Sequence, residues 1–137
     1  MRKDGFIYMN AFLFAGQGSQ YVGMGKELLE TNPEFLSVFE LASDITGTNL
    51  QKLIFNGSEE DLSRTVNSQP AIMAVSLLCF KCAVKHGITF DAVAGHSLGE
   101  YAAMVASGML SMEDGFRVIK ARAEAMDKAA GKTEGSM

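Results

Sequence analysis

The strongest constraint on the fold is the pentapeptide Gly95-His-Ser-Leu-Gly99, which joins a short apolar segment to a run of small residues. Residues 91–95 predict a short strand, and the alanine-rich segment that follows predicts a helix over about 98–107. A serine between two glycines at such a junction requires a very tight strand-to-helix turn, and the glycines remove side chains that would clash there. The pattern indicates a nucleophile elbow, with the Ser97 hydroxyl exposed above the sheet edge.

The same turn predicts where an oxyanion would be stabilised. The backbone N–H of Leu98 follows the serine, and the N-terminus of the next helix adds positive potential at that point. The structural alternative is an ordinary strand-to-helix loop, because a bare GxSxG pattern often occurs by chance. The strand before the motif and the helix of small residues after it favour the nucleophile.

A serine needs a general base to become a good nucleophile, and the chain has only two histidines. We expect the side chain of His96 to leave the turn in a different direction from Ser97. His86 precedes a strand about 16 Å long at 3.3 Å per residue, so it belongs at the opposite edge of the sheet. There it is better read as a cation that closes a helix C-terminus. We therefore expect this chain to lack its catalytic base.

A second glycine-rich loop, Gly16-Gln-Gly-Ser-Gln20, follows a predicted buried strand at 11–14. In a parallel sheet, loops that follow strands gather at one edge, so this loop can lie beside Ser97. The N–H of Gln17 is then a candidate second oxyanion donor. A turn that merely opens a helix fits the spacing equally well. A phosphate loop does not, because the Gly-Lys-Ser/Thr ending is absent.

Arg122 is the candidate binding residue of a predicted helix over 112–130. It lies on the flank of that helix's apolar stripe, one turn from Met126, so we expect it to be partly buried. A buried guanidinium needs a carboxylate or phosphate partner held by paired hydrogen bonds. Spacing alone favours a structural Asp or Glu as this partner.

The remaining segments complete an α/β prediction, because the order strand, helices, strand, helix, helix is typical of layered folds with a parallel sheet. Ser68 is the expected N-cap of the strongest helix, with Pro70 in its first turn. Two strands make a poor parallel sheet, so we expect more chain or a partner to complete it. Further helices are predicted near 22–31, 33–46 (ended by Gly47) and 68–86, with short helical turns over 50–66.

Composition excludes several classes of protein. The chain has 137 residues, 47% of them hydrophobic and 20% charged, which suits one globular domain or a large piece of one. A net charge of -4 without a basic patch argues against nucleic-acid binding. The longest apolar run, residues 71–80, is too short to cross a membrane, and no signal peptide is recognisable. Cys79 and Cys82 are expected to be core residues without a redox or metal role, in a cytoplasmic protein.

Four segments together resemble the malonyl-CoA:acyl-carrier-protein transacylases and the related polyketide acyltransferase domains. Arg122 also falls where that family carries an arginine, and Ala15 stands where proline is usual. The resemblance covers about residues 10–137. Because Met9 directly precedes the first predicted segment, 1–8 are interpreted as an N-terminal extension and 9–137 as the N-terminal part of the catalytic domain. The segments are Phe12–Gln20, Gly23–Gly25, Gln69–Ala71 and Gly95–Ala103.

The resemblance implies a role for each candidate residue. Ser97 would carry the malonyl group as an ester, after which the phosphopantetheine thiol of acyl carrier protein would take it in a ping-pong cycle. Leu98 and Gln17 would form the oxyanion hole. Arg122 would hold the free carboxylate of malonate, which replaces the structural role that spacing favoured. No cofactor or metal is implied, and the partners are malonyl-CoA and phosphopantetheinylated acyl carrier protein, with no nucleic acid or membrane.

The resemblance also implies an incomplete catalytic unit of fatty acid biosynthesis. The fold would be a partial α/β-hydrolase-like layered structure, with a short parallel sheet and flanking helices. The ferredoxin-like subdomain and the catalytic histidine of the family would belong to a missing C-terminal half. We therefore expect weak or no activity from the isolated chain. The alternatives are a serine hydrolase or lipase-like enzyme, a polyketide synthase acyltransferase domain, and a non-catalytic interaction module.

Overall fold

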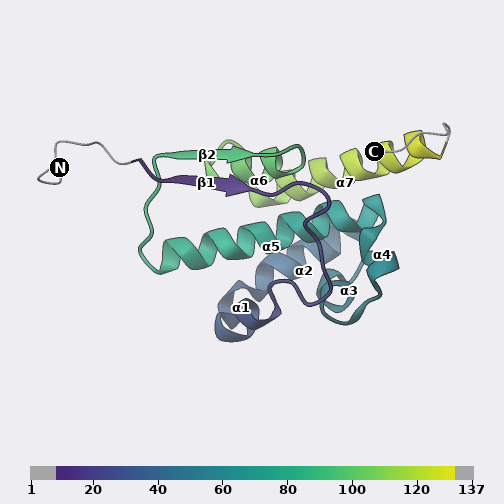
Figure 1. The fold of residues 1–137 in the computed structure, drawn as a ribbon, viewed down its shortest axis with the longest axis horizontal. Helices are drawn as coiled ribbons and strands as arrows, with labels where there is room; N and C mark the ends of the chain where they lie inside the picture. Colours follow the sequence, from purple (N-terminus) through teal and green to yellow (C-terminus); the bar gives the residue numbers. More distant parts are fainter. Residues whose placement is uncertain (1–8, 132–137) are drawn as a thin grey trace, which may run out of the picture.

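A computed structural model describes residues 9–131, and the predicted extension over 1–8 lies outside the described residues. Two short strands and the helices follow one another in the order that the sequence predicts: a strand, several helices, a second strand and two helices (Figure 1). The elements are β1 (Ala11–Phe14), α1 (Lys26–Thr31), the 3-10 helix η1 (Pro33–Phe35), α2 (Leu36–Thr46), α3 (Leu50–Asn56), α4 (Glu59–Ser63), α5 (Thr65–Lys85), β2 (Ala92–Gly95), α6 (Gly99–Ala106) and α7 (Met112–Ala130).

The two strands form a parallel pair, which confirms the α/β class and the short parallel sheet. Their register runs from Ala11 opposite Ala92 to Phe14 opposite Gly95. Both strands therefore end at the same level of the sheet. The loop that follows β1 and the turn that follows β2 leave from one edge, as expected for parallel strands.

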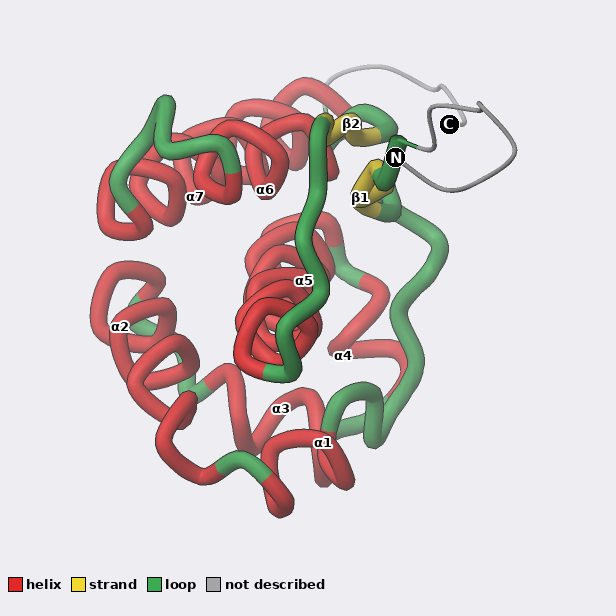
Figure 2. Tube along the Cα trace, turned by 90° about the vertical axis from the view of Figure 1, so that its left-hand side faces the viewer, coloured by secondary structure: helices red, strands yellow, loops and turns green. Residues whose placement is uncertain are grey.

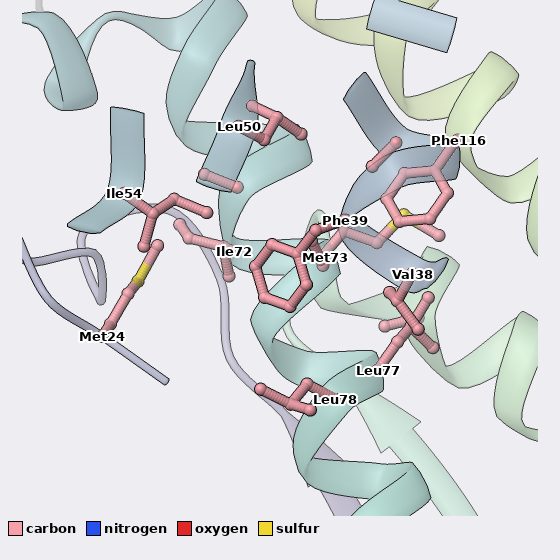
Figure 3. Packing of buried hydrophobic residues seen from close by; sticks show 14 of the residues in the cluster. Met24, Val38, Phe39, Leu50, Ile54, Ile72, Met73, Leu77, Leu78 and Phe116 are labelled. Atoms are coloured by element: carbon pink, nitrogen blue, oxygen red, sulfur yellow. The ribbon is translucent and has the colours of Figure 1, made fainter. Parts of the chain in front are cut away.

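Helix α5 lies near the middle of the molecule, with the other helices and the sheet around it (Figure 2). Its sequence is apolar on most sides, which predicts burial, and this prediction is confirmed: Met73, Leu77 and Leu78 are almost completely buried. Phe39 from α2 and Phe116 from α7 pack in the same core (Figure 3). Full burial of each such side chain stabilises the fold by about 1.5–3 kcal/mol, so α5 is the element on which the others assemble.

One face of the sheet packs against α5 through aromatic side chains. Phe12 meets Phe80 of α5 edge to face, with ring centroids 5.4 Å apart, and Phe14 lies on the same side. Because side chains alternate along a strand, Leu13 points the other way, and 79% of its surface is exposed. Within the described part of the chain, the sheet is therefore covered on its aromatic side and open at Leu13.

The start of α5 differs from the prediction. The helix begins at Thr65, directly after Arg64 adopts an extended conformation that separates it from α4. Ser68 is consequently not an N-cap. It lies fully buried inside the helix, and its hydroxyl has no hydrogen-bond partner among the described residues. Pro70 lies in the second turn, where it removes one helical hydrogen bond to the carbonyl of Val66.

Two other helix starts also differ from the prediction. The helix expected near 22–31 begins only at Lys26, because Gly23 and Gly25 take positive φ values of 90° and 73° that end the preceding turns. The helix expected over 33–46 opens with the three 3-10 residues of η1 before α2 begins. Its end was predicted correctly, since Gly47 adopts the left-handed conformation and its N–H bonds to the carbonyl of Ser43.

The two cysteines have different environments, although both were expected in the core. Cys82 is buried, and this burial raises the pKa of its thiol. Cys79 is exposed, so the prediction for this residue is wrong. Helix α5 is not covered on all sides, and Cys79 faces an apolar hollow beside β1.

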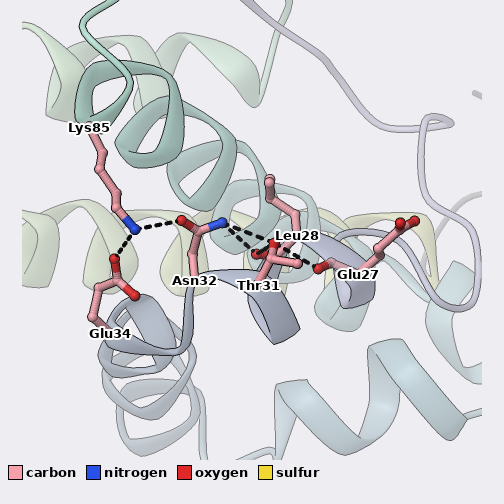
Figure 4. A network of polar contacts seen from close by, with 6 residues as sticks. All are labelled: Glu27, Leu28, Thr31, Asn32, Glu34 and Lys85. Atoms are coloured by element: carbon pink, nitrogen blue, oxygen red, sulfur yellow. Dashed lines mark hydrogen bonds and ion pairs between the residues drawn. The ribbon is translucent and has the colours of Figure 1, made fainter.

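A polar network anchors the end of α5 to the segment between α1 and η1 (Figure 4). Lys85 donates hydrogen bonds to the side chains of Asn32, at 2.8 Å, and Glu34. Asn32 is almost completely buried and donates to the carbonyl of Leu28 at 3.0 Å. The donation from Lys85 lowers the pKa of the Glu34 carboxyl.

Among the described helices, none is long and apolar enough to cross a membrane.

Candidate active site

Ser97 has an unusual backbone conformation at the turn between β2 and α6. Its φ is 56°, and it is the only non-glycine residue with a positive φ among residues 9–131. This region costs a side-chain-bearing residue roughly 1–2 kcal/mol. Hydrogen bonds on both sides hold the turn in place: the N–H of His96 bonds to the carbonyl of Phe14, and the N–H of Glu100 to the carbonyl of Ser97.

The glycines on either side of Ser97 allow an unusually close backbone approach. A Cβ atom on Gly95 would lie 2.1 Å from the carbonyl carbon of Gly99. A Cβ atom on Gly99 would lie 2.2 Å from the carbonyl oxygen of Phe14. No side chain fits at either position, so α6 starts directly against the ends of both strands.

The side chain of Arg122 extends from α7 to this turn. Its Nη2 donates a 2.8 Å hydrogen bond to the Ser97 hydroxyl oxygen, and its Nη1 donates a 2.6 Å hydrogen bond to Oε1 of Gln69 in α5. The guanidinium also lies over the ring of Tyr101 in α6, 5.7 Å from the ring centroid. Helices α5, α6 and α7 thus all contribute to holding one half-buried cation beside an exposed serine.

The charge of Arg122 is not neutralised by any described carboxylate. No Asp or Glu in the described part of the chain lies within ion-pair distance of it, so the structural acid that spacing favoured is not found. A guanidinium has five N–H donors, and the two hydrogen bonds above use two of them. The remaining three leave Arg122 able to bind an anion, and a carboxylate fits its planar geometry best.

The glycine-rich loop after β1 lies beside the serine turn. A Cβ atom on Gly16 would lie 2.5 Å from Nδ1 of His96, so the imidazole packs against the loop backbone. Gln17 connects the loop to α5, through hydrogen bonds to Thr65 at 3.3 Å and from Gln69 at 3.5 Å. The expected proximity of loop and turn is confirmed, because the register of the strands brings them to one edge.

Two backbone N–H groups beside this edge are available for an oxyanion. Within residues 9–131, the amides of Gln17 and Leu98 make no hydrogen bond. Gln17 belongs to the loop after β1, and Leu98 is the residue before the first turn of α6. The free N–H of Leu98 lies at the start of α6, where the helix dipole favours negative charge.

Neither histidine hydrogen-bonds to Ser97. The ring of His96 packs against Gly16, and His86 is an exposed residue at the C-terminal end of α5. The hydroxyl oxygen of Ser97 has Arg122 as its partner among the described residues. In that same part of the chain, no group of three or more His, Cys, Asp or Glu side chains could hold a metal ion.

Gln69 lies in the site, although the sequence indicated it only as part of the segment Gln69–Ala71 and predicted no role for it. It is fully buried and contacts Arg122, Gln17 and Met126. An amide two residues before the apolar run of residues 71–80 was the available signal, because a buried glutamine needs polar partners. The sequence did not indicate which residues those partners are.

A family model for the acyl transferase domain matches residues 11–137, which is most of the chain. The chain belongs to the acyl transferase domain family. Among similar proteins is the malonyl-CoA:acyl carrier protein transacylase of Bacillus subtilis strain 168, which is 46% identical over 127 residues. That alignment covers 93% of this chain and 40% of the relative.

Solved structures of acyl transferase domain proteins share the fold. A malonyl-CoA:acyl carrier protein transacylase from Xanthomonas oryzae matches with a TM-score of 0.84 and 41% identity, over 89% of this chain and 39% of that one. A malonyl transacylase solved in complex with a type II polyketide acyl carrier protein matches with a TM-score of 0.84 and 36% identity, over 89% and 40%. The chain therefore spans about 40% of the length of these relatives.

Proposed function

We propose that Ser97 accepts a malonyl group from malonyl-CoA and passes it to the phosphopantetheine thiol of acyl carrier protein, in fatty acid biosynthesis. The observation that carries this proposal is the 2.8 Å hydrogen bond from the unneutralised guanidinium of Arg122 to the Ser97 hydroxyl. One group can attack a thioester, and the other can bind a free acid beside it. The names of the relatives, malonyl-CoA:acyl carrier protein transacylases, support the same substrates.

The chemical step follows from the geometry of the turn. The Ser97 oxygen attacks the thioester carbonyl carbon and gives up its proton to a base, and a C–O bond forms. The C–S bond then breaks, and the departing coenzyme A thiolate takes up that proton. Negative charge develops on the carbonyl oxygen, where the free N–H groups of Leu98 and Gln17 would stabilise it. In the second half of the cycle, the carrier-protein thiol attacks the ester and restores the Ser97 hydroxyl.

Arg122 supplies the selectivity for a carboxylated acyl group. Its three unused N–H donors can bind the malonyl carboxylate, while an acyl group without a carboxylate leaves the cation unpaired. This arrangement argues against a lipase-like function, because a lipid ester has no free carboxylate beside the ester group for Arg122 to bind.

The proton of Ser97 needs an acceptor, and among residues 9–131 the side chain hydrogen-bonded to this hydroxyl is the donor Arg122. We propose that His96 and His86 do not act as the base, because His96 packs against Gly16 and His86 ends α5. The family resemblance implies a histidine from further along the longer relatives. Acylation by the 137-residue chain alone is therefore expected to be slow relative to those proteins.

Intact-mass spectrometry after incubation with malonyl-CoA tests the proposal. The expected product carries one malonyl group, mapped to Ser97 by peptide analysis, and Ser97→Ala carries none. Labelling that persists in Ser97→Ala, or that maps to another residue, would contradict it. Adding a carrier-protein thiol should remove the label faster than water does, whereas a serine hydrolase would lose it to water. Comparing carrier proteins of fatty acid and polyketide type separates those two pathways.

A further inference from the structure

Gln69 occupies the point where α5, α7 and the loop after β1 meet. Its side chain is fully buried, and its Oε1 accepts the 2.6 Å hydrogen bond from Arg122 Nη1. Its Nε2 faces Oε1 of Gln17 at 3.5 Å and the sulfur of Met126 at 3.3 Å. This buried amide therefore contacts both the guanidinium of Arg122 and the loop after β1, so it does more than fill space in the core.

The orientation of this amide follows from chemistry alone. A guanidinium only donates hydrogen bonds, so the Gln69 atom that faces Arg122 must be the carbonyl oxygen. Its NH2 group then points at Gln17, whose own carbonyl oxygen must face it. This leaves the NH2 of Gln17 to donate to the hydroxyl of Thr65. The hydrogen bonds therefore run in one direction, from Arg122 through Gln69 and Gln17 to Thr65.

All described partners of Arg122 are neutral. They are the amide of Gln69, the hydroxyl of Ser97 and the ring of Tyr101. An acidic side chain in the place of Gln69 would hold the guanidinium equally well, but it would also cancel its charge. A neutral acceptor orients the cation and leaves its charge free for another anion.

We propose that Gln69 is a positioning residue that determines acyl selectivity: it orients Arg122 without neutralising it, and it links Arg122 to the loop that carries the Gln17 amide. This inference rests on the proposed function, since it assumes that the acyl carboxylate binds Arg122. It also predicts a specific phenotype. Changing the amide to a carboxylate should weaken binding of malonyl groups while leaving binding of uncharged acyl groups in place.

Gln69→Glu is the direct test, because it keeps the size of the side chain and adds only a charge. The introduced carboxylate would pair with Arg122 and compete with the carboxylate of the substrate. Gln69→Met is a second variant, which removes the hydrogen-bond acceptor but adds no charge. Gln51→Glu, at an exposed position in α3, makes the same chemical change far from Arg122 and controls for general repulsion of the anionic coenzyme.

The measurement is the dissociation constant of malonyl-CoA and of acetyl-CoA, determined by calorimetry for each variant of the full chain. The preference for malonyl-CoA is expected to fall by about tenfold or more in Gln69→Glu, the size of one charge-assisted hydrogen bond. It should fall by a smaller factor in Gln69→Met and stay unchanged in Gln51→Glu. Circular dichroism and thermal melting establish that each variant is folded.

Arg122→Ala separates failure of this inference from failure of the proposed function. If the wild-type chain shows no preference for malonyl-CoA, or if Arg122→Ala retains it, the proposed function is wrong. If Arg122→Ala abolishes the preference but Gln69→Glu retains it, only the role of Gln69 is wrong. If Gln69→Glu does not fold, Gln69→Met decides: equal weakening of both thioesters would show a merely structural residue and overturn the inference.

Discussion

At the scale of single residues, the site depends on the backbone conformation of Ser97 and on two glycines where no side chain fits. Ser97 takes a left-handed backbone conformation that places its hydroxyl beside Arg122. Gly95 and Gly99 allow the chain to pass within contact of itself on either side. The backbone strain is therefore confined to Ser97, and Leu98, which follows it, is fully buried.

Gly99→Ala is expected to destabilise the fold by about 2–3 kcal/mol, since its Cβ would lie 2.2 Å from the Phe14 carbonyl oxygen and the backbone would have to move. Urea denaturation measures this difference. Gly131→Ala is the matched control: its φ is −70° and the nearest atom to a Cβ is 3.7 Å away. An equal loss in both variants would contradict the steric explanation.

Ser68→Ala is expected to stabilise the protein by about 0.5–1 kcal/mol. The Ser68 hydroxyl is buried without a partner in the described part of the chain, and alanine is the better helix former. Thermal unfolding measures the change. Ser58→Ala should have the opposite sign, costing about 1 kcal/mol, because Ser58 caps α4 by accepting from the N–H of Asp61. Destabilisation by Ser68→Ala would indicate that its hydroxyl has a favourable interaction.

At the scale of elements, polar contacts join helices that the chain does not connect directly. The end of α5 is linked to the segment between α1 and η1 by Lys85, Asn32 and Glu34 (Figure 4). At the other end of α5, Gln69 links the helix to α7 and to the loop after β1. Helix α5 is thus held by polar contacts at both ends: to the site at its start, and to the segment between α1 and η1 at its end.

The ion pair of Glu34 and Lys85 predicts a pH dependence. Lys85 lowers the pKa of Glu34 in the folded state, so this carboxylate contributes stability above its unfolded pKa and loses it as the pH falls through the lowered value. Glu34→Gln should therefore lower the melting temperature at pH 7, and the difference from wild type should shrink as the pH falls below about 4.5 and vanish once the pH is below the lowered pKa.

The effect should be small, because both side chains are nearly half exposed. Glu30→Gln, at an exposed position in α1, is the control and should show no such dependence. A difference between Glu34→Gln and wild type that persists in acid would rule out the ion pair as its origin.

At the scale of the whole molecule, the described chain has an apolar surface beside its sheet. A hollow of about 430 Å³ lies between β1 and α5, and the adjoining Leu13 and Tyr21 are 79% and 60% exposed. Neither Ser97 nor Arg122 lines this hollow. Exposed apolar surface of this kind typically marks an interaction site. The chain spans about 40% of the length of its relatives.

We expect this surface to bind the dye ANS in the folded state, and Leu13→Ser to reduce the fluorescence. The free energy of unfolding should change by less than about 0.5 kcal/mol, because Leu13 is largely exposed already. Met109→Ser, which changes an equally exposed apolar residue outside the hollow, should leave the dye signal unchanged. Equal dye binding by wild type and Leu13→Ser would show that the dye does not bind at this hollow.

The sequence by itself determined the local elements and the serine turn. The spacing of apolar residues and the residues that end strands and helices predicted β1 and α7 with their observed bounds. The two glycines of the serine turn predicted the close backbone approach around Ser97. It missed the start of α5, because the break at Arg64 carries no glycine or proline signal. Such local features depend on residues only a few positions apart, which a pattern can show.

Only the tertiary structure decided which side chains meet. The register of β1 and β2 brought two loops to one edge, and the packing of α5 against α7 placed Gln69 beside Arg122. It also replaced the expected acidic partner of Arg122 with a neutral amide. These contacts join residues more than fifty positions apart, and their energies depend on distance, orientation and burial, which no local pattern contains.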